Sequence, residues 1–210
     1  MSNLSGKAWW DANQANWPNS TEAADLEPEF RESVQRFLSA LSEAGARVKI
    51  NSTRRDPLRA YLMHYAWRLA HGEIQAAEIP PPPSEIRNPK SEIRNPKSGN
   101  PYPPALPCPD IEWDHGNEER SRQAAREMIS RDCFNMAFAA SLTSTHIDGK
   151  AIDMTITWDG PLQIRERDGT LTEITSLPRD GANVELHAIG ATYGVIKHPT
   201  DRPHWSVDGT

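Results

Sequence analysis

A seven-residue stretch, Ala-Ile-Asp-Met-Thr-Ile-Thr at 151–157, constrains the fold of this chain more than any other feature. Its β-branched residues favour a strand, and successive side chains of a strand point to opposite faces. Ile152, Met154 and Ile156 then share one apolar face, while Asp153 points to the other. We therefore expect a sheet that packs one face against a core and carries polar side chains on the opposite face.

Two histidines have spacings relative to this strand that suggest a metal site. His146 precedes Asp153 by seven residues, and Gly149 between them allows a tight turn. Near the C-terminal end, Pro203 cannot sit inside a central ladder, so a second strand is expected to begin at His204. If the two strands are neighbours, His146, Asp153 and His204 converge on one ion. Two imidazoles and one carboxylate suit zinc, whose catalytic sites keep a fourth position for water.

Two further residues beside this group have side chains that could take part in a reaction. Asp201 is a carboxylate without a metal to bind, and it is close enough in sequence to His204 to act as a base towards a water molecule. Ser144 could contact a substrate through its hydroxyl, or it could cap the turn before His146, and both roles stay open. The alternative is that these groups are structural histidines and surface carboxylates, but four of them in this arrangement favour a metal site.

One known family carries a similar two-part motif. The chain resembles the zinc D-Ala-D-Ala carboxypeptidase and L-Ala-D-Glu endopeptidase family, which includes vancomycin-resistance dipeptidases and phage endolysins, in Ser144-x-His146-x-x-Gly149-x-Ala151-x-Asp153 and Asp201-x-Pro-His204-Trp. The resemblance implies zinc ligation by His146, Asp153 and His204, with Asp201 as general base. In having aspartate at position 201, the chain resembles the endolysin-like branch of this family. The implied fold is α+β, with a small antiparallel sheet that carries the zinc site and packs against several helices, as in hedgehog-type and DD-peptidase proteins.

The resemblance extends upstream to Ser-Thr-Arg-Arg-Asp at 52–56. Family members carry an arginine there, at the end of a strand, which helps to polarise the scissile carbonyl. Arg54 fits that position best, and Arg55 is the alternative because the two arginines are adjacent. The likeness runs from about residue 30 to the end of the chain, with one insert.

The resemblance implies a zinc metallopeptidase that hydrolyses peptide bonds in the stem peptides of peptidoglycan. The expected activity is that of an L-Ala-D-Glu endopeptidase or of a D-Ala-D-Ala carboxypeptidase. The alternative is a non-catalytic zinc-containing module that binds the cell wall or a protein. The carboxylate of Asp201 favours the enzyme, because a non-catalytic zinc site does not need a base there.

Proline content predicts how the chain is divided. Residues 80–109 hold 11 of its 18 prolines, and Ser-Glu-Ile-Arg-Asn-Pro-Lys occurs there twice, at 84–90 and 91–97. One proline in every seven residues is incompatible with a coiled coil or a continuous helix. We expect this segment to be a flexible loop inserted in a single domain of residues 27–210. Residues 1–26 are polar apart from three tryptophans, and we expect them to form a docked N-terminal arm.

Hydrophobic spacing and helix-boundary residues predict the other elements. We expect helices from Pro28 to before Gly45, from Pro57 to near Gly72, over 118–131 with Asn117 as the cap, and over 186–193. We also expect strands at 48–50 and 194–197, a hairpin around Asp168-Gly169, and a buried segment from Phe134 to Ala139.

Charge and composition limit the partners and the location. The net charge of −6 argues against non-specific nucleic-acid binding, which needs a basic surface. No apolar run approaches the roughly 20 residues that cross a bilayer, so we expect no membrane span. The first residues lack the apolar core of a secretory signal, and we expect synthesis in the cytoplasm, with action at the cell wall after release or export. Cys108 and Cys133 are expected to be free thiols, and the protein to be a monomer.

Overall fold

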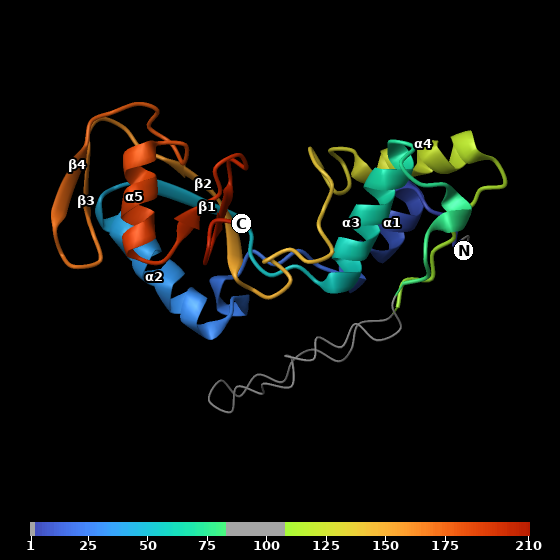
Figure 1. Ribbon diagram of the computed structural model, residues 1–210, viewed down its shortest axis with the longest axis horizontal. Helices are drawn as coiled ribbons and strands as arrows, with labels where there is room; N and C mark the ends of the chain where they lie inside the picture. Colours follow the sequence, from blue (N-terminus) through green and yellow to red (C-terminus); the bar gives the residue numbers. More distant parts are fainter. Residues whose placement is uncertain (1–2, 83–107) are drawn as a thin grey trace. The chain divides into compact units, whose positions relative to one another are not determined.

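The structure, a computed structural model, describes residues 3–82 and 108–210 (Figure 1). Within these residues the fold is α+β, as predicted, with five α-helices, a four-stranded antiparallel sheet and a two-stranded sheet. Most of the predicted insert at 80–109, including both copies of its repeat, lies outside the described residues.

The chain forms two compact units, and each combines two separate stretches of sequence. Unit 1 comprises Met1–Pro18 and Asp56–Leu142, and unit 2 comprises Asn19–Arg55 and Thr143–Thr210. This division differs from the expected N-terminal arm at 1–26 followed by one domain at 27–210. The reason is that the tryptophans of the first eighteen residues are buried in the core of unit 1, so this stretch is an integral part of that unit.

Unit 2 is built on the four-stranded sheet. Two helices, α2 (Pro28–Glu43) and α5 (Val184–Thr192), pack with one face of this sheet in a single apolar core (Figure 1). In that core the Phe37 ring lies 5.6 Å from the ring of Trp205. The strands run in the order β1 (Arg47–Ser52), β2 (Ala151–Thr157), β6 (His204–Ser206) and β5 (Ile196–Lys197), and all neighbours are antiparallel.

The pairing of β2 with β6 decides which residues face the core. Ile152 pairs with Trp205, and Asp153 pairs with His204. Because side chains alternate along a strand, the apolar pair faces the helices and the polar pair faces away from them. This confirms the predicted alternation of β2 and the predicted start of β6 at His204.

The turn that precedes β2 is tight because it packs against the start of α2. Gly149 has φ +69°, and its carbonyl accepts a hydrogen bond from the N–H of Glu27 at 2.9 Å. A β-carbon at position 149 would lie only 2.9 Å from that same nitrogen. Glycine is therefore required here by both conformation and space.

The two-stranded sheet of unit 2 is the predicted hairpin. Strands β3 (Leu162–Arg165) and β4 (Leu171–Ile174) pair on either side of Asp168-Gly169. The inward residues of β3, Leu162 and Ile164, join the core of unit 2.

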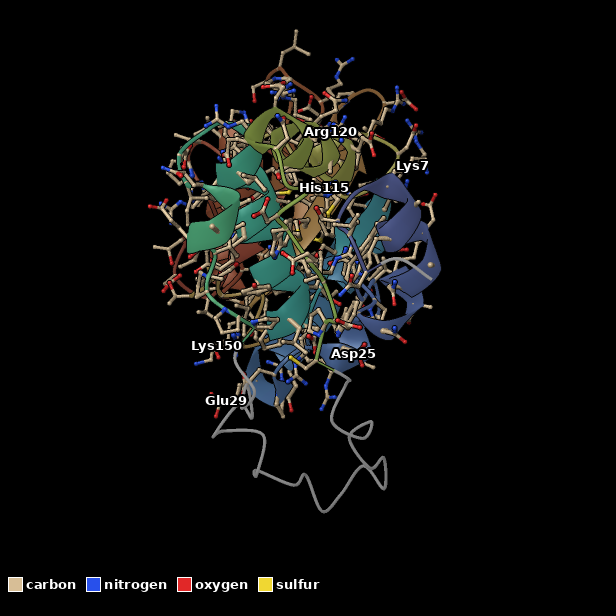
Figure 2. All side chains as sticks on the ribbon, turned by 90° about the vertical axis from the view of Figure 1, so that its right-hand side faces the viewer. Lys7, Asp25, Glu29, His115, Arg120 and Lys150 are labelled. Carbon is tan, nitrogen blue, oxygen red and sulfur yellow. The ribbon has the colours of Figure 1, made fainter. Side chains whose placement is uncertain are left out.

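Unit 1 is helical, with α1 (Lys7–Asn13), α3 (Pro57–Ala70) and α4 (Glu118–Ile129). The Asn117 side chain accepts a hydrogen bond from the N–H of Arg120, which confirms it as the cap of α4. His115 lies beside these helices (Figure 2), with its Nε2 3.0 Å from Ser5 Oγ. In the predicted buried segment at 134–139, Phe134 is buried, but the prediction is wrong at Phe138, which is 74% exposed, and at Ala139, which is also exposed.

None of the helices in residues 3–82 and 108–210 is both long enough and apolar enough to cross a bilayer.

Substituting Gly149 by alanine should destabilise unit 2 more than the same change at Gly169. Both glycines have positive φ, so each alanine carries a backbone penalty of about 1–2 kcal/mol. Only position 149 adds a steric clash, since nothing lies within 4 Å of a β-carbon at position 169. Overpacking of this kind costs about 1–3 kcal/mol more. Urea unfolding followed by circular dichroism measures both free energies, and equal losses would contradict the packing role of Gly149.

Candidate metal centre

Three side chains of unit 2 converge on the sheet face opposite α2 and α5. His146 Nε2 lies 3.2 Å from Asp153 Oδ1, His204 Nδ1 lies 3.1 Å from the same oxygen, and the two imidazole nitrogens are 3.1 Å apart. Both histidines are buried, and Asp153 is partly buried. Among the described residues this is the one group of histidine, cysteine and acidic side chains that could hold a metal ion. The predicted convergence of the three residues is confirmed.

Main-chain oxygens fix the orientation of both imidazoles. The other ring nitrogen of His146, Nδ1, donates to the carbonyl oxygen of Thr53, and His204 Nε2 donates to the main-chain oxygen of Thr210 at 3.1 Å. The C-terminal residues return to the sheet to make this second contact (Figure 1). A neutral imidazole has one N–H. In each ring this hydrogen is on the nitrogen that donates to the main-chain oxygen, His146 Nδ1 or His204 Nε2. His146 Nε2 and His204 Nδ1 therefore present lone pairs towards each other and towards the carboxylate.

This arrangement favours a cation at its centre. Two nitrogen lone pairs and a carboxylate oxygen repel one another when they meet without a donor, and burial makes unpaired acceptors costly. A metal ion satisfies all three at once, as in sites where each ligating histidine donates its other N–H to a carbonyl or carboxylate. The group can therefore hold a metal ion.

The carboxylate at the centre stays ionised to low pH. Burial raises the pKa of Asp153. When the rings of His146 and His204 are protonated, their hydrogen bonds and charges lower it by more, so that the pKa of this carboxyl is held well below its usual range. Asp153 is thus an anion wherever the protein is expected to work. An anionic oxygen between two imidazoles is a suitable ligand for a divalent cation.

Two cationic side chains lie within electrostatic range of this group. The Arg55 guanidinium and the Lys197 ammonium each interact with the charges of both Asp153 and Asp201. Burial lowers the pKa of Arg55 and of Lys197, while the two carboxylates raise it in each case. The buried Nε of Arg55 has no hydrogen-bond partner within the described chain. Asp201 is partly exposed, and its carbonyl accepts a hydrogen bond from the N–H of His204 at 3.2 Å.

The two predicted arginine candidates occupy different surroundings. Arg55 is tied to the site through its backbone as well, because its N–H donates to the carbonyl of His146 at 3.0 Å. The carbonyl of Arg54 accepts from the N–H of Ser20 at 3.3 Å. The charges of Asp153 and Asp201 thus act on Arg55, the alternative of the pair, and the role of Arg54 stays a prediction.

Ser144 caps the turn that carries the first ligand. Its hydroxyl oxygen accepts a hydrogen bond from the N–H of His146 at 3.3 Å, and its carbonyl accepts from the N–H of Ile147 at 2.9 Å. This contact is the turn-capping role that the sequence left open, and contact with a substrate stays a prediction.

The other histidines and both cysteines lie outside the metal group, as expected. A ring nitrogen contacts a backbone carbonyl in His64, His71 and His187. In His115 it contacts the hydroxyl of Ser5, and His198 accepts hydrogen bonds from backbone N–H groups. Cys108 and Cys133 are free thiols.

Sequence reasoning missed the groups that orient the ligands. The oxygens of Thr53 and Thr210 belong to the main chain, so no residue type reveals them. Lys197 had a weak signal, being a lone lysine next to the His198–His204 segment, and its cationic side chain contacts three carbonyls there.

The chain matches no protein-family model, and no curated protein shows a significant match to it.

The protein should bind one divalent metal ion per chain through this group. Replacing His146, Asp153 or His204 by glutamine or asparagine should weaken binding by more than about 100-fold, since even the outer partners of ligands contribute 10–100-fold. Metal should also raise the melting temperature of the wild type, because it binds the folded state. Equilibrium dialysis of chelator-treated protein against several divalent metals measures the affinity.

The matched control is His71→Gln, which changes an exposed histidine that contacts its own helix. This variant should bind metal like the wild type. Equal affinity in all four variants would show that the ion binds elsewhere.

Proposed function

We propose that this protein is a zinc-dependent peptidase that hydrolyses peptide bonds in the stem peptides of peptidoglycan. The observation that carries the proposal is the meeting of three lone-pair donors, His146 Nε2, Asp153 Oδ1 and His204 Nδ1, with a separate carboxylate and a guanidinium close by. A purely structural ion needs neither of these two extra charges. A hydrolytic site uses a base for water and a positive group for the carbonyl oxygen.

The distances are compatible with zinc. A tetrahedral zinc ion has bonds of about 2.0–2.2 Å to nitrogen and oxygen, which puts its ligand atoms about 3.3 Å apart. The three distances between the donor atoms here are 3.1–3.2 Å. Three protein ligands of the His₂-carboxylate type also leave a position for water, which is the pattern of catalytic rather than structural zinc.

In this proposal the chain's own residues divide the chemistry among them. A zinc ion held by the triad supplies Lewis acidity, which lowers the pKa of a water molecule and polarises a carbonyl. Asp201 takes the proton of the attacking water and delivers it to the nitrogen of the leaving amine. Arg55 donates to the carbonyl oxygen as negative charge develops on it.

Arg55 is better suited to this role than Arg54. Its guanidinium has a buried donor without a partner within the described residues, and it lies in the field of Asp153 and Asp201. An unsatisfied guanidinium is costly unless a further acceptor arrives. A substrate oxygen at the metal would supply that acceptor.

The substrate class follows from the resemblance of the motifs around His146 and His204 to peptidases of bacterial cell walls. Two bonds are candidates, the L-Ala-D-Glu bond inside the stem peptide and the terminal D-Ala-D-Ala bond. Aspartate at position 201 favours the endopeptidase. The protein would then act on the cell wall after release or export from the cytoplasm.

Purified zinc-loaded protein should cleave muropeptides, and Asp201→Asn should abolish most of that activity. Loss of a general base typically costs about 10²–10⁴-fold in kcat. Zinc affinity should stay within about threefold of the wild type, because Asp201 is not one of the three ligands. Mass spectrometry of fragments from digested sacculi measures the rate and identifies the bond that is cut.

Asp148→Asn is the matched control, since Asp148 is an exposed carboxylate on the same turn as His146. It should retain wild-type activity. Tight binding of sacculi by zinc-loaded wild type without any cleavage would contradict the enzyme and favour a non-catalytic cell-wall module.

The two arginines can be separated by parallel substitutions to methionine, which keeps the length of the side chain and removes the charge. Arg55→Met should lower kcat by about 100-fold, in line with the removal of one donor to a developing oxyanion. Arg54→Met should change kcat by less than about threefold. The reverse order of effects in steady-state kinetics would assign the role to Arg54 instead.

A further inference from the structure

The segment between β5 and β6 is a closed loop that carries the candidate base. The N–H of His198 donates to the carbonyl of His204 at 3.0 Å, so the two ends of the loop are joined. Asp201 lies inside this loop, three residues before the metal ligand His204. How this loop is held therefore decides where the Asp201 carboxylate lies.

The main chain of Asp201 is held on both sides. Its N–H donates to Nδ1 of His198 at 3.0 Å, and the N–H of Thr200 donates to the same nitrogen at 3.2 Å. Its carbonyl accepts from the Lys197 ammonium and from the N–H of His204, the latter at 3.2 Å. With both main-chain polar groups fixed, only the two side-chain torsions of Asp201 remain free.

The Lys197 ammonium holds the loop through contacts with its carbonyl oxygens. Besides the carbonyl of Asp201, it contacts the carbonyls of His198 at 2.8 Å and His204 at 3.2 Å. Lysine has three N–H donors and no acceptor, so these three carbonyls use its full capacity. Its backbone belongs to β5, which pairs with β6, so the support is rigid.

We propose that His198 is a positioning residue that holds Asp201 in the orientation needed for proton transfer, with Lys197 as its counterpart on the carbonyl side. The proposal rests on the proposed peptidase function. His198 accepts two adjacent N–H groups at a single nitrogen, as an Asx or Ser/Thr side chain does in a turn. Its ring also packs edge-on against His204 with centroids 5.6 Å apart, which fixes the position of Nδ1.

Two substitutions separate the acceptor from the bulk of the side chain. His198→Asn keeps an acceptor, because asparagine Oδ1 stands at the same number of bonds from the main chain as histidine Nδ1. His198→Leu keeps a comparable size and removes the acceptor. Both are compared with the wild type as zinc-loaded full-length protein.

The first measurement does not depend on activity. Amide hydrogen exchange, followed by NMR, reports the protection of the Thr200 and Asp201 N–H groups. We expect protection to fall by about tenfold or more in His198→Leu and to stay near the wild-type value in His198→Asn. Unchanged protection in the leucine variant would overturn the positioning role.

The second measurement is the kinetics of muropeptide cleavage. His198→Leu should lower kcat by about 10- to 100-fold, with KM and zinc affinity within about threefold, because a misplaced base affects the chemical step rather than binding. His198→Asn should restore kcat. A merely structural histidine would lower the melting temperature without this separation of kcat from KM, and that result would overturn the proposal.

Different results would overturn the peptidase function and the positioning role of His198. A wild type that cleaves no muropeptide overturns the peptidase function, whatever the amide exchange shows. An active wild type whose His198→Leu variant keeps full kcat overturns the role of His198 alone. Should the leucine variant not fold, His198→Ala removes the acceptor without adding an apolar group, and the same outcomes apply.

Discussion

The register between β2 and β6 is the constraint on which the rest of unit 2 depends. Ile152 opposite Trp205 belongs to the core, and the next pair, Asp153 opposite His204, faces away from it. A slip of one residue would turn every side chain of one strand to the other face. Trp205 is fully buried against Phe37, so the apolar contact that fixes the register also brings two candidate metal ligands together.

The remaining parts of the site come from segments that flank the same sheet. The chain leaving β1 supplies the carbonyl of Thr53 and then Arg55, and the turn before β2 supplies His146. Because β1, β2 and β6 are neighbours in that order, their ends meet at one place. The helices do not provide any of the three side chains of the group; the residues just before α2 instead support the turn at Gly149.

Local sequence signals were sufficient for helices α2 to α5, for the strands of the two sheets, and for the three side chains that could hold a metal ion. Pro28, Pro57 and Asn117 mark helix starts by their own chemistry, and period-two alternation placed Asp153 on the polar face. These local signals could not predict which segments pack against each other over long distances in the sequence. Periodicity identifies an apolar face but not its partner, so the two-unit division was missed and Phe138 was expected to be buried. Likewise, local sequence cannot decide between two adjacent arginines, because the choice depends on which guanidinium the tertiary structure brings near the carboxylates.

The balance of charge around the triad is a further argument for the peptidase function proposed above, as opposed to simple ion storage. Asp153 and Asp201 contribute two negative charges, and Arg55 and Lys197 contribute two positive charges, so these four side chains cancel. Any divalent cation held by the triad then leaves the site positive. A store for a cation is best served by a surplus of anionic ligands, because the protein charge then neutralises the ion. A site with a positive surplus instead stabilises negative charge that develops on a substrate oxygen during the reaction.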